Sequence, residues 1–331
     1  MRGLLLWLST TLVFAIIGWF ANTAYHLPQN SNLIASVKPT PLYKYAIENL
    51  SKAHFEPGKI EFGKIIKNTP KYTSYEFSME FNPDFTDTLK KTSGVINIPS
   101  AEGKFPVVAM FRGYVDQKTY VTRQGTQRVG EVLAENGFVT IAPDFLGYGN
   151  SDIEASDIFE ARFQTYVTSA VLIKSINSLP VWDQKNIFVW GHSNGGQIAL
   201  TLLEITGVDY PAVLWAPVGK PFPFSILAYT DESDDHGKYI RSELSKFEET
   251  YDAEKFSLEN YFSQIKAPIS LLQGTNDDAV PFYWSDSLAK ILKENGAEIA
   301  YTKYPGADHN LQPSWNRAVL TTLSFFNKMR K

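Results

Sequence analysis

The hydrophobic and polar positions of the chain fall into three successive patterns, and each pattern predicts a different kind of structure. Residues 4–20 form an apolar run without a charge. Three strand-like runs follow at 59–67, 72–81 and 93–98, separated by turn residues. From residue 105 onward, short apolar runs alternate with helical patterns. This order predicts antiparallel lead-in strands followed by a mostly parallel, doubly wound sheet with helices on its faces.

The alternating part supplies the elements of that predicted sheet. A continuous apolar run, as at 105–111, is typical of a strand covered on both faces. Thr40 and Pro41 further predict the N-cap and first turn of a short helix that ends near Ser51. The other expected strands are 138–142, 186–190, 212–215, 269–272 and 298–304, and the expected helices are 124–136, 159–179, 195–205, 284–294 and 315–328.

One segment interrupts the alternation. Residues 217–268 separate two expected strands by more than a normal connection and are rich in aromatic and acidic side chains. Two interpretations remain open: a helical excursion whose aromatics form a small core of their own, or a lid over the strand ends. We therefore divide the chain into an N-terminal segment (1–24), a tether with a short helix (25–57) and one α/β domain (58–331) with an insertion at 218–266.

The N-terminal segment predicts contact with a membrane. Arg2 precedes the apolar run and no further Lys or Arg occurs before Lys38, which places the N-terminus inside. The run, extended through residue 24, approaches the thickness of a hydrocarbon core. The two alanines that could precede a cleavage site put Trp19 or Asn22 at the −3 position, so an uncleaved anchor is favoured over a signal peptide. The domain would then lie outside the cytoplasm, anchored or, after cleavage, secreted.

Composition narrows the function classes. The 331 residues are 44% hydrophobic and 20% charged, as in folded globular proteins. With Lys+Arg 31, Asp+Glu 35, a net charge of −4 and no basic run, nucleic acid is excluded as the main partner. The chain has no Cys, which excludes disulfides, thiolate metal sites and a cysteine nucleophile. It also lacks the H-E-x-x-H, P-loop and G-x-G-x-x-G patterns, so neither a metal nor a cofactor is expected.

The candidate chemistry centres on Ser193. A Gly-x-Ser-x-Gly pattern, with Gly191 and Gly195 around Ser193, joins the expected strand at 186–190 to a helical pattern. A sharp turn at this place presents a serine hydroxyl at the carboxyl edge of a sheet. Glycines flank it because a Cβ at either position would collide with a neighbouring strand or helix. Ser193 is therefore the candidate nucleophile.

A serine hydroxyl is a poor nucleophile at neutral pH and needs a base, which in this architecture follows an acid along the chain. Only His309 falls in a loop after a late strand, from which an imidazole reaches the sheet edge. Next to Ser193, the backbone is expected to turn the His192 side chain away. The other histidines are His26 beside the predicted anchor, His54 in the lead-in and His236 in the insertion.

The acid that orients His309 is expected at the end of the strand at 269–272. A carboxylate there holds the imidazole in one tautomer and stabilises its charged form. By position, Asp277 and Asp278 are both candidates, whereas Asp308 adjoins the base and points elsewhere. The oxyanion of the reaction also needs donors. The backbone N–H of Asn194, directly after the nucleophile, is the first candidate.

The second oxyanion donor is expected from the loop after the strand at 105–111, where we choose the backbone N–H of Tyr114. Together, the segments at 191–196, 274–281 and 306–309 resemble the α/β-hydrolase superfamily, and within it the catalytic domain of the prolyl oligopeptidase family and its dienelactone-hydrolase-like relatives. The segment at 143–151 is similar to the loop after the fourth strand of that branch. The resemblance covers most of the chain from about residue 40.

The resemblance implies a Ser193–His309–Asp277 triad, because the acid of the family is the third residue after Gly274. Arg112 departs from the pattern, since many relatives have His before the oxyanion glycine. The resemblance favours a serine-type peptidase that forms an acyl-enzyme. A carboxylesterase acting on small acyl esters is the alternative, and an inert membrane-tethered binding protein is a remote one. Dienelactone hydrolase activity itself is not expected, since it uses a Cys.

Overall fold

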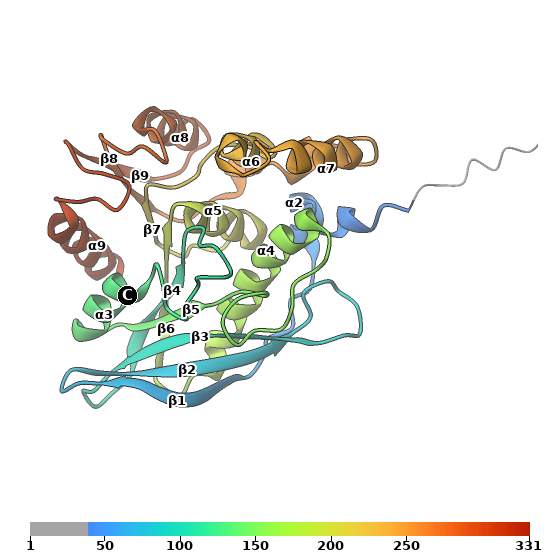
Figure 1. The fold of residues 1–331 in the computed structure, drawn as a ribbon. Coiled ribbons are helices and arrows are strands. Elements are labelled where there is room, and N and C mark those ends of the chain that lie inside the picture. Colours follow the sequence, from blue (N-terminus) through green and yellow to red (C-terminus); the bar gives the residue numbers. More distant parts are fainter. Residues whose placement is uncertain (1–38) are drawn as a thin grey trace, which may run out of the picture. The chain divides into compact units, whose positions relative to one another are not determined.

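The computed structural model describes residues 39–331, which form a nine-stranded mixed sheet with helices on both faces (Figure 1). The sheet order is β1-β2-β3-β5-β4-β6-β7-β8-β9. The strands are β1 (Ile60–Asn68), β2 (Tyr72–Phe81), β3 (Lys90–Pro99), β4 (Phe105–Phe111), β5 (Val139–Pro143), β6 (Trp182–His192), β7 (Ala212–Trp215), β8 (Ile269–Gly274) and β9 (Ile299–Tyr304). The α-helices are α2 (Ile47–Lys52), α3 (Gln127–Glu135), α4 (Ile158–Ser175), α5 (Asn194–Thr206), α6 (Phe224–Leu227), α7 (Lys238–Glu248), α8 (Phe282–Glu294) and α9 (Trp315–Met329).

The pairing of the strands confirms the predicted antiparallel lead-in and parallel body. β1, β2, β3 and β5 pair antiparallel in that order, and β5, β4, β6, β7, β8 and β9 pair parallel. The predicted strands β2, β4 and β7 have the observed bounds, and the ends of the others differ by a few residues. All six parallel strands therefore direct their carboxyl ends to one edge of the sheet, where a site is expected in such folds.

The central strand β4 shows why this sheet needs helices on both faces. Its seven residues are all buried. Val107, Ala109 and Phe111 pack into one apolar cluster with α2, α4, α5 and α8, whereas Val108 and Met110 pack into a second cluster with α3 and α9. The period of two along a strand divides its side chains between two cores, so a continuous apolar run is required.

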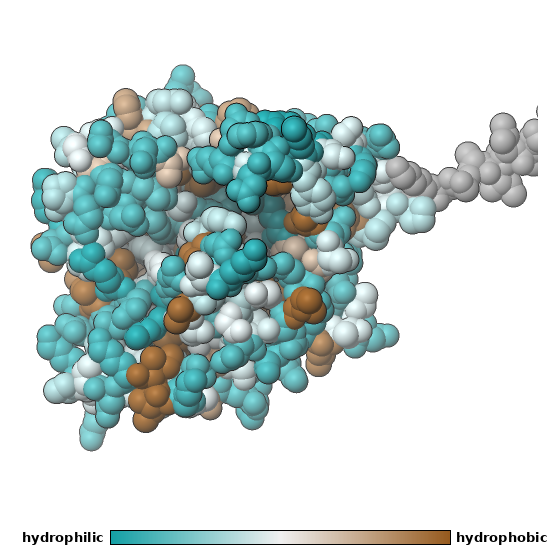
Figure 2. Space-filling view, viewed as in Figure 1, coloured by the Kyte–Doolittle hydropathy of each residue, from teal (hydrophilic) through white to brown (hydrophobic). Residues whose placement is uncertain are grey.

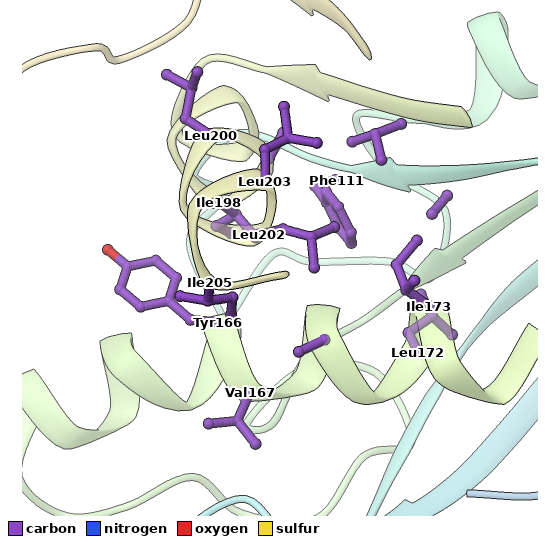
Figure 3. Close-up of a cluster of buried hydrophobic side chains, with 14 of the residues drawn as sticks. Phe111, Tyr166, Val167, Leu172, Ile173, Ile198, Leu200, Leu202, Leu203 and Ile205 are labelled. Carbon is purple, nitrogen blue, oxygen red and sulfur yellow. The ribbon is translucent and has the colours of Figure 1, made fainter. Parts of the chain in front are cut away.

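Helix α5, which begins beside Ser193, is buried around most of its circumference. Ile198, Leu202 and Leu203 pack with Val167 of α4 and Phe111 of β4 in the larger core (Figure 3). Truncating one such leucine to alanine typically costs about 2–5 kcal/mol of stability. The start of α5 is thus fixed by a rigid core rather than by a flexible loop.

The insertion packs onto α4. Phe222 and Phe247 contact the ring of Phe159 at centroid distances of 5.7 and 5.0 Å, and Phe256 stacks on Phe163 at 4.9 Å. The interpretation that the aromatics of the insertion form a small core of their own is therefore wrong for Phe222, Phe247 and Phe256, which belong to the main core. Four short 3-10 helices, η2 (Ile176–Ser178), η3 (Thr230–Glu232), η4 (Ala253–Phe256) and η5 (Leu258–Gln264), extend α4 or lie in the insertion.

The start of the described chain differs from the prediction of one capped helix. The 3-10 helix η1 (Pro41–Tyr45) precedes α2, and the extended ψ of 140° at Ala46 separates the two. The side chain of Thr40 makes no capping hydrogen bond. The predicted anchor at 1–24 lies outside the described residues. Within residues 39–331, none of the helices combines the length and apolarity of a membrane span.

Candidate active site

Ser193 occupies a strained turn between β6 and α5. Its φ is +56° and its ψ is −122°, a conformation that L-residues with a Cβ rarely adopt and that marks functional turns. A Cβ at Gly195 would collide with the carbonyl of Phe111 in the neighbouring strand, and one at Gly191 would collide with the carbonyl of Gly195. The geometry therefore bears out the steric reason given for the two glycines. The turn leaves Ser193 half-buried at the carboxyl edge of the sheet.

His309 and Asp277 form a hydrogen-bonded pair beside this turn. The Nδ1 of His309 lies 3.0 Å from Oδ1 and 2.9 Å from Oδ2 of Asp277. The Asp277 side chain is fully buried and that of His309 is 19% exposed. Of the two adjacent candidates, the structure brings Asp277 to the imidazole and leaves Asp278 exposed. Asp308 accepts the N–H groups of Asn310 and Gln312, which accounts for its orientation away from the pair.

The Asp277 carboxylate is held by several donors. Burial by itself would raise the pKa of this carboxyl group, but the hydrogen bond from His309 and the N–H of Val280 at 2.8 Å more than compensate, and its pKa is lowered. The buried Gln273 donates its amide to Oδ2 at 2.8 Å and to the Val280 carbonyl at 3.1 Å. Its own oxygen accepts from Ser285 at 2.7 Å. Asp277 is thus ionised and fixed at neutral pH.

His192, set aside as a base because its side chain was expected to turn away, instead lies against His309. The two ring centroids are 4.7 Å apart, and Nε2 of His192 lies 3.0 Å from the backbone oxygen of His309. Burial, with the neighbouring imidazole, lowers the pKa of His192 to about 4. The ring is therefore neutral at pH 7 and donates its Nε2–H to that carbonyl. It holds the loop that carries the candidate base.

The structure brings Ser193 and His309 to one edge of the sheet through this contact, because His192 directly precedes Ser193. Among the described residues, no hydrogen bond joins the Ser193 hydroxyl to His309, and Nε2 of His309 has no partner within residues 39–331. Hydrogen bonds between nucleophile and base are often long in unliganded enzymes and tighten when substrate binds. The free Nε2 is the nitrogen that a general base in this arrangement uses.

The candidate oxyanion loop lies directly against the nucleophile. A Cβ at Gly113 would lie 3.0 Å from the Cβ and 3.5 Å from the Oγ of Ser193, so the loop backbone is in contact with the serine. Nη1 of Arg112 donates to the Gly113 carbonyl at 3.0 Å. Since the next peptide bond is trans, the N–H of Tyr114 points away from that guanidinium. The Tyr114 side chain is 77% exposed.

Arg112 is buried between aromatic rings, which the sequence alone did not indicate. Its guanidinium carbon lies 4.0 Å from the ring centroid of Tyr148 and 4.5 Å from that of Tyr120. Its Nη2 donates to the backbone oxygen of Asp144 at 3.0 Å. The buried Asp144 carboxylate in turn accepts from Tyr120 at 2.7 Å and from Ser93 at 2.6 Å. Arg112 thus ties the oxyanion loop to the segment after β5.

Two cavities flank the site. One of about 310 Å³ is lined by Trp190, Trp215, Trp315 and His192, with Arg128 stacked on Trp315 at 3.9 Å. The other, of about 400 Å³, includes both candidate oxyanion residues and the inner side of α4. Figure 2 shows this face of the molecule hollowed beside the α6–α7 region. Within residues 39–331, acidic and histidine side chains form no cluster able to hold a metal ion.

Comparison with known proteins finds a matching family model and a curated relative. The model of the prolyl oligopeptidase family matches residues 126–331. The curated acetyl esterase Axe7A of Xylanibacter ruminicola is 25% identical over 256 residues, 70% of this chain and 55% of its own, so the chain spans about half the length of this relative.

Solved structures of three hydrolases share the fold. The acetyl xylan esterase of Paenibacillus sp. R4 has a TM-score of 0.63 at 16% identity, over 89% of this chain and 99% of its own. Acetyl xylan esterase 1 of Thermoanaerobacterium sp. JW/SL YS485 has a TM-score of 0.59 at 16% identity, over 88% and 95%. A puromycin-hydrolysing peptidase of Mycobacterium tuberculosis has a TM-score of 0.56 at 17% identity, over 82% and 39%.

Proposed function

Because the chain belongs to the prolyl oligopeptidase family and is a serine hydrolase of the α/β-hydrolase fold, we propose that it is a carboxylesterase acting on small acyl esters. The observation that carries this proposal is the acetyl esterase relative, together with acetyl xylan esterase structures that align over nearly their whole length. The peptidase structure aligns over only 39% of its chain. Our expectation from the sequence put the peptidase first, and the comparisons support its esterase alternative.

In the proposed mechanism, Oγ of Ser193 attacks the ester carbonyl and Nε2 of His309 accepts its proton. Asp277, bonded to Nδ1–H, keeps Nε2 unprotonated and stabilises the imidazolium that forms. The N–H groups of Asn194 and Tyr114 bind the oxyanion. His309 then protonates the leaving alcohol. A water molecule, deprotonated by the same imidazole, hydrolyses the acyl-enzyme and regenerates Ser193.

The test compares kcat/KM for 4-nitrophenyl acetate with kcat/KM for aminoacyl 4-nitroanilides, for the wild-type protein and for Ser193→Ala. We expect the wild-type protein to hydrolyse the ester and Ser193→Ala to show no turnover of it. Turnover of the anilides alone would refute the esterase and favour the peptidase, which the family match also supports. No turnover, with no labelling of Ser193 by a fluorophosphonate, would favour an inert binding protein.

We further propose that residues 1–24 anchor this hydrolase in a membrane, with the domain outside the cytoplasm. The support is the uncharged run at 4–20 between Arg2 and Lys38. Expression of the full chain, followed by membrane fractionation and protease protection, tests this proposal. Recovery of the full-length protein in the wash fraction, or protection of the domain on the cytoplasmic side, would contradict it.

A further inference from the structure

The 400 Å³ cavity beside the candidate oxyanion hole contains a guanidinium that forms no ion pair within the described part of the chain. Tyr114 and Asn194 line this cavity together with Arg162 of α4. A substrate whose carbonyl oxygen lies between the two backbone N–H groups therefore shares the cavity with this arginine. The cavity is large enough for a small ester, since it falls in the size range of small-molecule sites.

Arg162 has one buried donor that is unsatisfied among the described residues. Its Nη2 donates to the side-chain oxygen of Gln197. Its Nε is buried and has no hydrogen-bond partner among the described residues. In residues 39–331 Arg162 takes part in none of the ion pairs, in contrast to Arg123 and Arg241. A buried donor without a partner costs about 1–3 kcal/mol, a cost that a ligand offsets when it supplies the acceptor.

The neighbouring contacts hold this guanidinium in place. Gln197 is buried on α5, and its amide nitrogen lies 3.4 Å from both the Lys220 carbonyl and the Ser225 hydroxyl. Its oxygen is thereby directed to Arg162. An arginine anchored on one side presents its other N–H groups in a fixed planar array, which matches the geometry of a carboxylate.

The acidic side chains of the same cavity already have donors of their own. Glu154 accepts from the side-chain amide of Gln117 at 2.8 Å, and Asp116 accepts the backbone N–H of Lys118 at 2.8 Å. Neither carboxylate pairs with Arg162. Within residues 39–331 the Arg162 guanidinium is thus uncompensated by an ion pair. Lys118, which also lines the cavity, is unpaired in this part of the chain too, but it is exposed to solvent, whereas Nε of Arg162 is buried.

We propose that Arg162 binds a carboxylate carried by the substrate, so that the enzyme favours esters with a free carboxylate near the cleaved bond. This inference rests on the proposed esterase function and names its substrate class. The carboxylate belongs either to the acyl group, as in a monoester of a dicarboxylic acid, or to the leaving alcohol. Both sources present the same anion to Arg162, and the experiment separates them.

Two substrate pairs differ only in this charge. 4-Nitrophenyl hydrogen adipate and its methyl ester test the acyl side, and 4-acetoxybenzoate and its methyl ester test the alcohol side. In wild type we expect kcat/KM for the acid to exceed that for the methyl ester in one pair, at low ionic strength, by about tenfold to a hundredfold, as for a hydrogen bond to a charged group. The difference is expected mainly in KM.

The variants assign this preference to Arg162. Arg162→Gln is expected to lower the ratio of acid to methyl ester about tenfold or more, and Arg162→Lys to restore part of it. Arg128→Gln, which changes an arginine of the other cavity, is the matched control and is expected to keep the wild-type ratio. Free adipate is expected to inhibit the wild type competitively and more strongly than adipamide, which tests the site should Arg162→Gln fail to fold.

The outcomes separate the two proposals. Hydrolysis of the methyl esters without a preference for either acid, and no selective inhibition by adipate, would overturn the carboxylate site and leave the esterase standing. An equal loss for acid and methyl ester in Arg162→Gln would reduce the arginine to a structural role. Failure to hydrolyse any ester would overturn both.

Discussion

Replacing Arg112 by methionine tests how the candidate oxyanion hole is built. Methionine has a similar length and fits between Tyr120 and Tyr148, but it removes the hydrogen bonds to the carbonyls of Gly113 and Asp144. The Gly113 carbonyl then lacks the donor that fixes its direction. Because the N–H of Tyr114 belongs to the same peptide plane, its direction becomes free as well.

The expected magnitude follows from these contacts. One oxyanion donor contributes about 10²–10³ to kcat, so Arg112→Met is expected to lower kcat about a hundredfold. The KM for a neutral ester is expected to change less than about threefold, because the donor acts on the charge that develops in the transition state. The loss of two charged hydrogen bonds and of the stacking on tyrosine is expected to lower the free energy of unfolding by about 2–4 kcal/mol.

The assay measures kcat and KM for 4-nitrophenyl acetate, with stability followed by urea unfolding. Arg128→Met is the matched control, since this arginine also stacks on an aromatic ring, Trp315, but lies away from Gly113. The control is expected to retain kcat. A folded Arg112→Met protein with kcat within threefold of wild type would refute the role of Arg112 in orienting the N–H of Tyr114.

Three further outcomes are expected. Asp277→Asn is expected to lower kcat about 10⁴-fold through the wrong His309 tautomer, and a loss below tenfold in ester kinetics would contradict it. His192→Phe keeps a ring but removes the bond to the His309 carbonyl, so kcat should fall about tenfold with little change in KM; an unchanged kcat would exclude this positioning role. Burial raises the pKa of Glu204, whose oxygens have no described partner, so the folded protein binds this proton more tightly and stability falls as pH rises above about 5. In urea titrations at pH 5 and 8, Glu204→Met should lose less free energy of unfolding between the two pH values than the wild type does. An equal loss in the two proteins would contradict this prediction.

The sheet was predictable because its signal is local. The apolar run of β4 and the turns around β2 identify strands without knowledge of their partners. Helix ends were less predictable: Ala46 divides the first helical segment through its extended ψ, although Thr40 and Pro41 have the residue types of a helix start. The aromatics of the insertion were recognisable as apolar, but their packing on Phe159 and Phe163 depends on tertiary contacts.

In the candidate site, too, some residues could be predicted from local sequence patterns and others could not. Ser193, His309 and Asp277 each lie in a recognisable local sequence pattern. In the structure His309 and Asp277 are in contact. The supporting residues are connected only in space. Gln273 contacts Asp277 from within a buried strand, and Arg112 contacts the backbone of Asp144, which lies 32 residues further along the chain. Nothing local to the sequence of α4 distinguishes Arg162 from a solvated arginine.

The central claim is that Ser193 is a nucleophile activated by His309. Labelling of the purified protein with a fluorophosphonate, followed by peptide mass spectrometry, tests it directly. We expect one adduct, on Ser193, with a labelling rate that falls by orders of magnitude in His309→Gln while the protein remains folded. Labelling at another serine, or an unchanged rate in His309→Gln, would contradict the account.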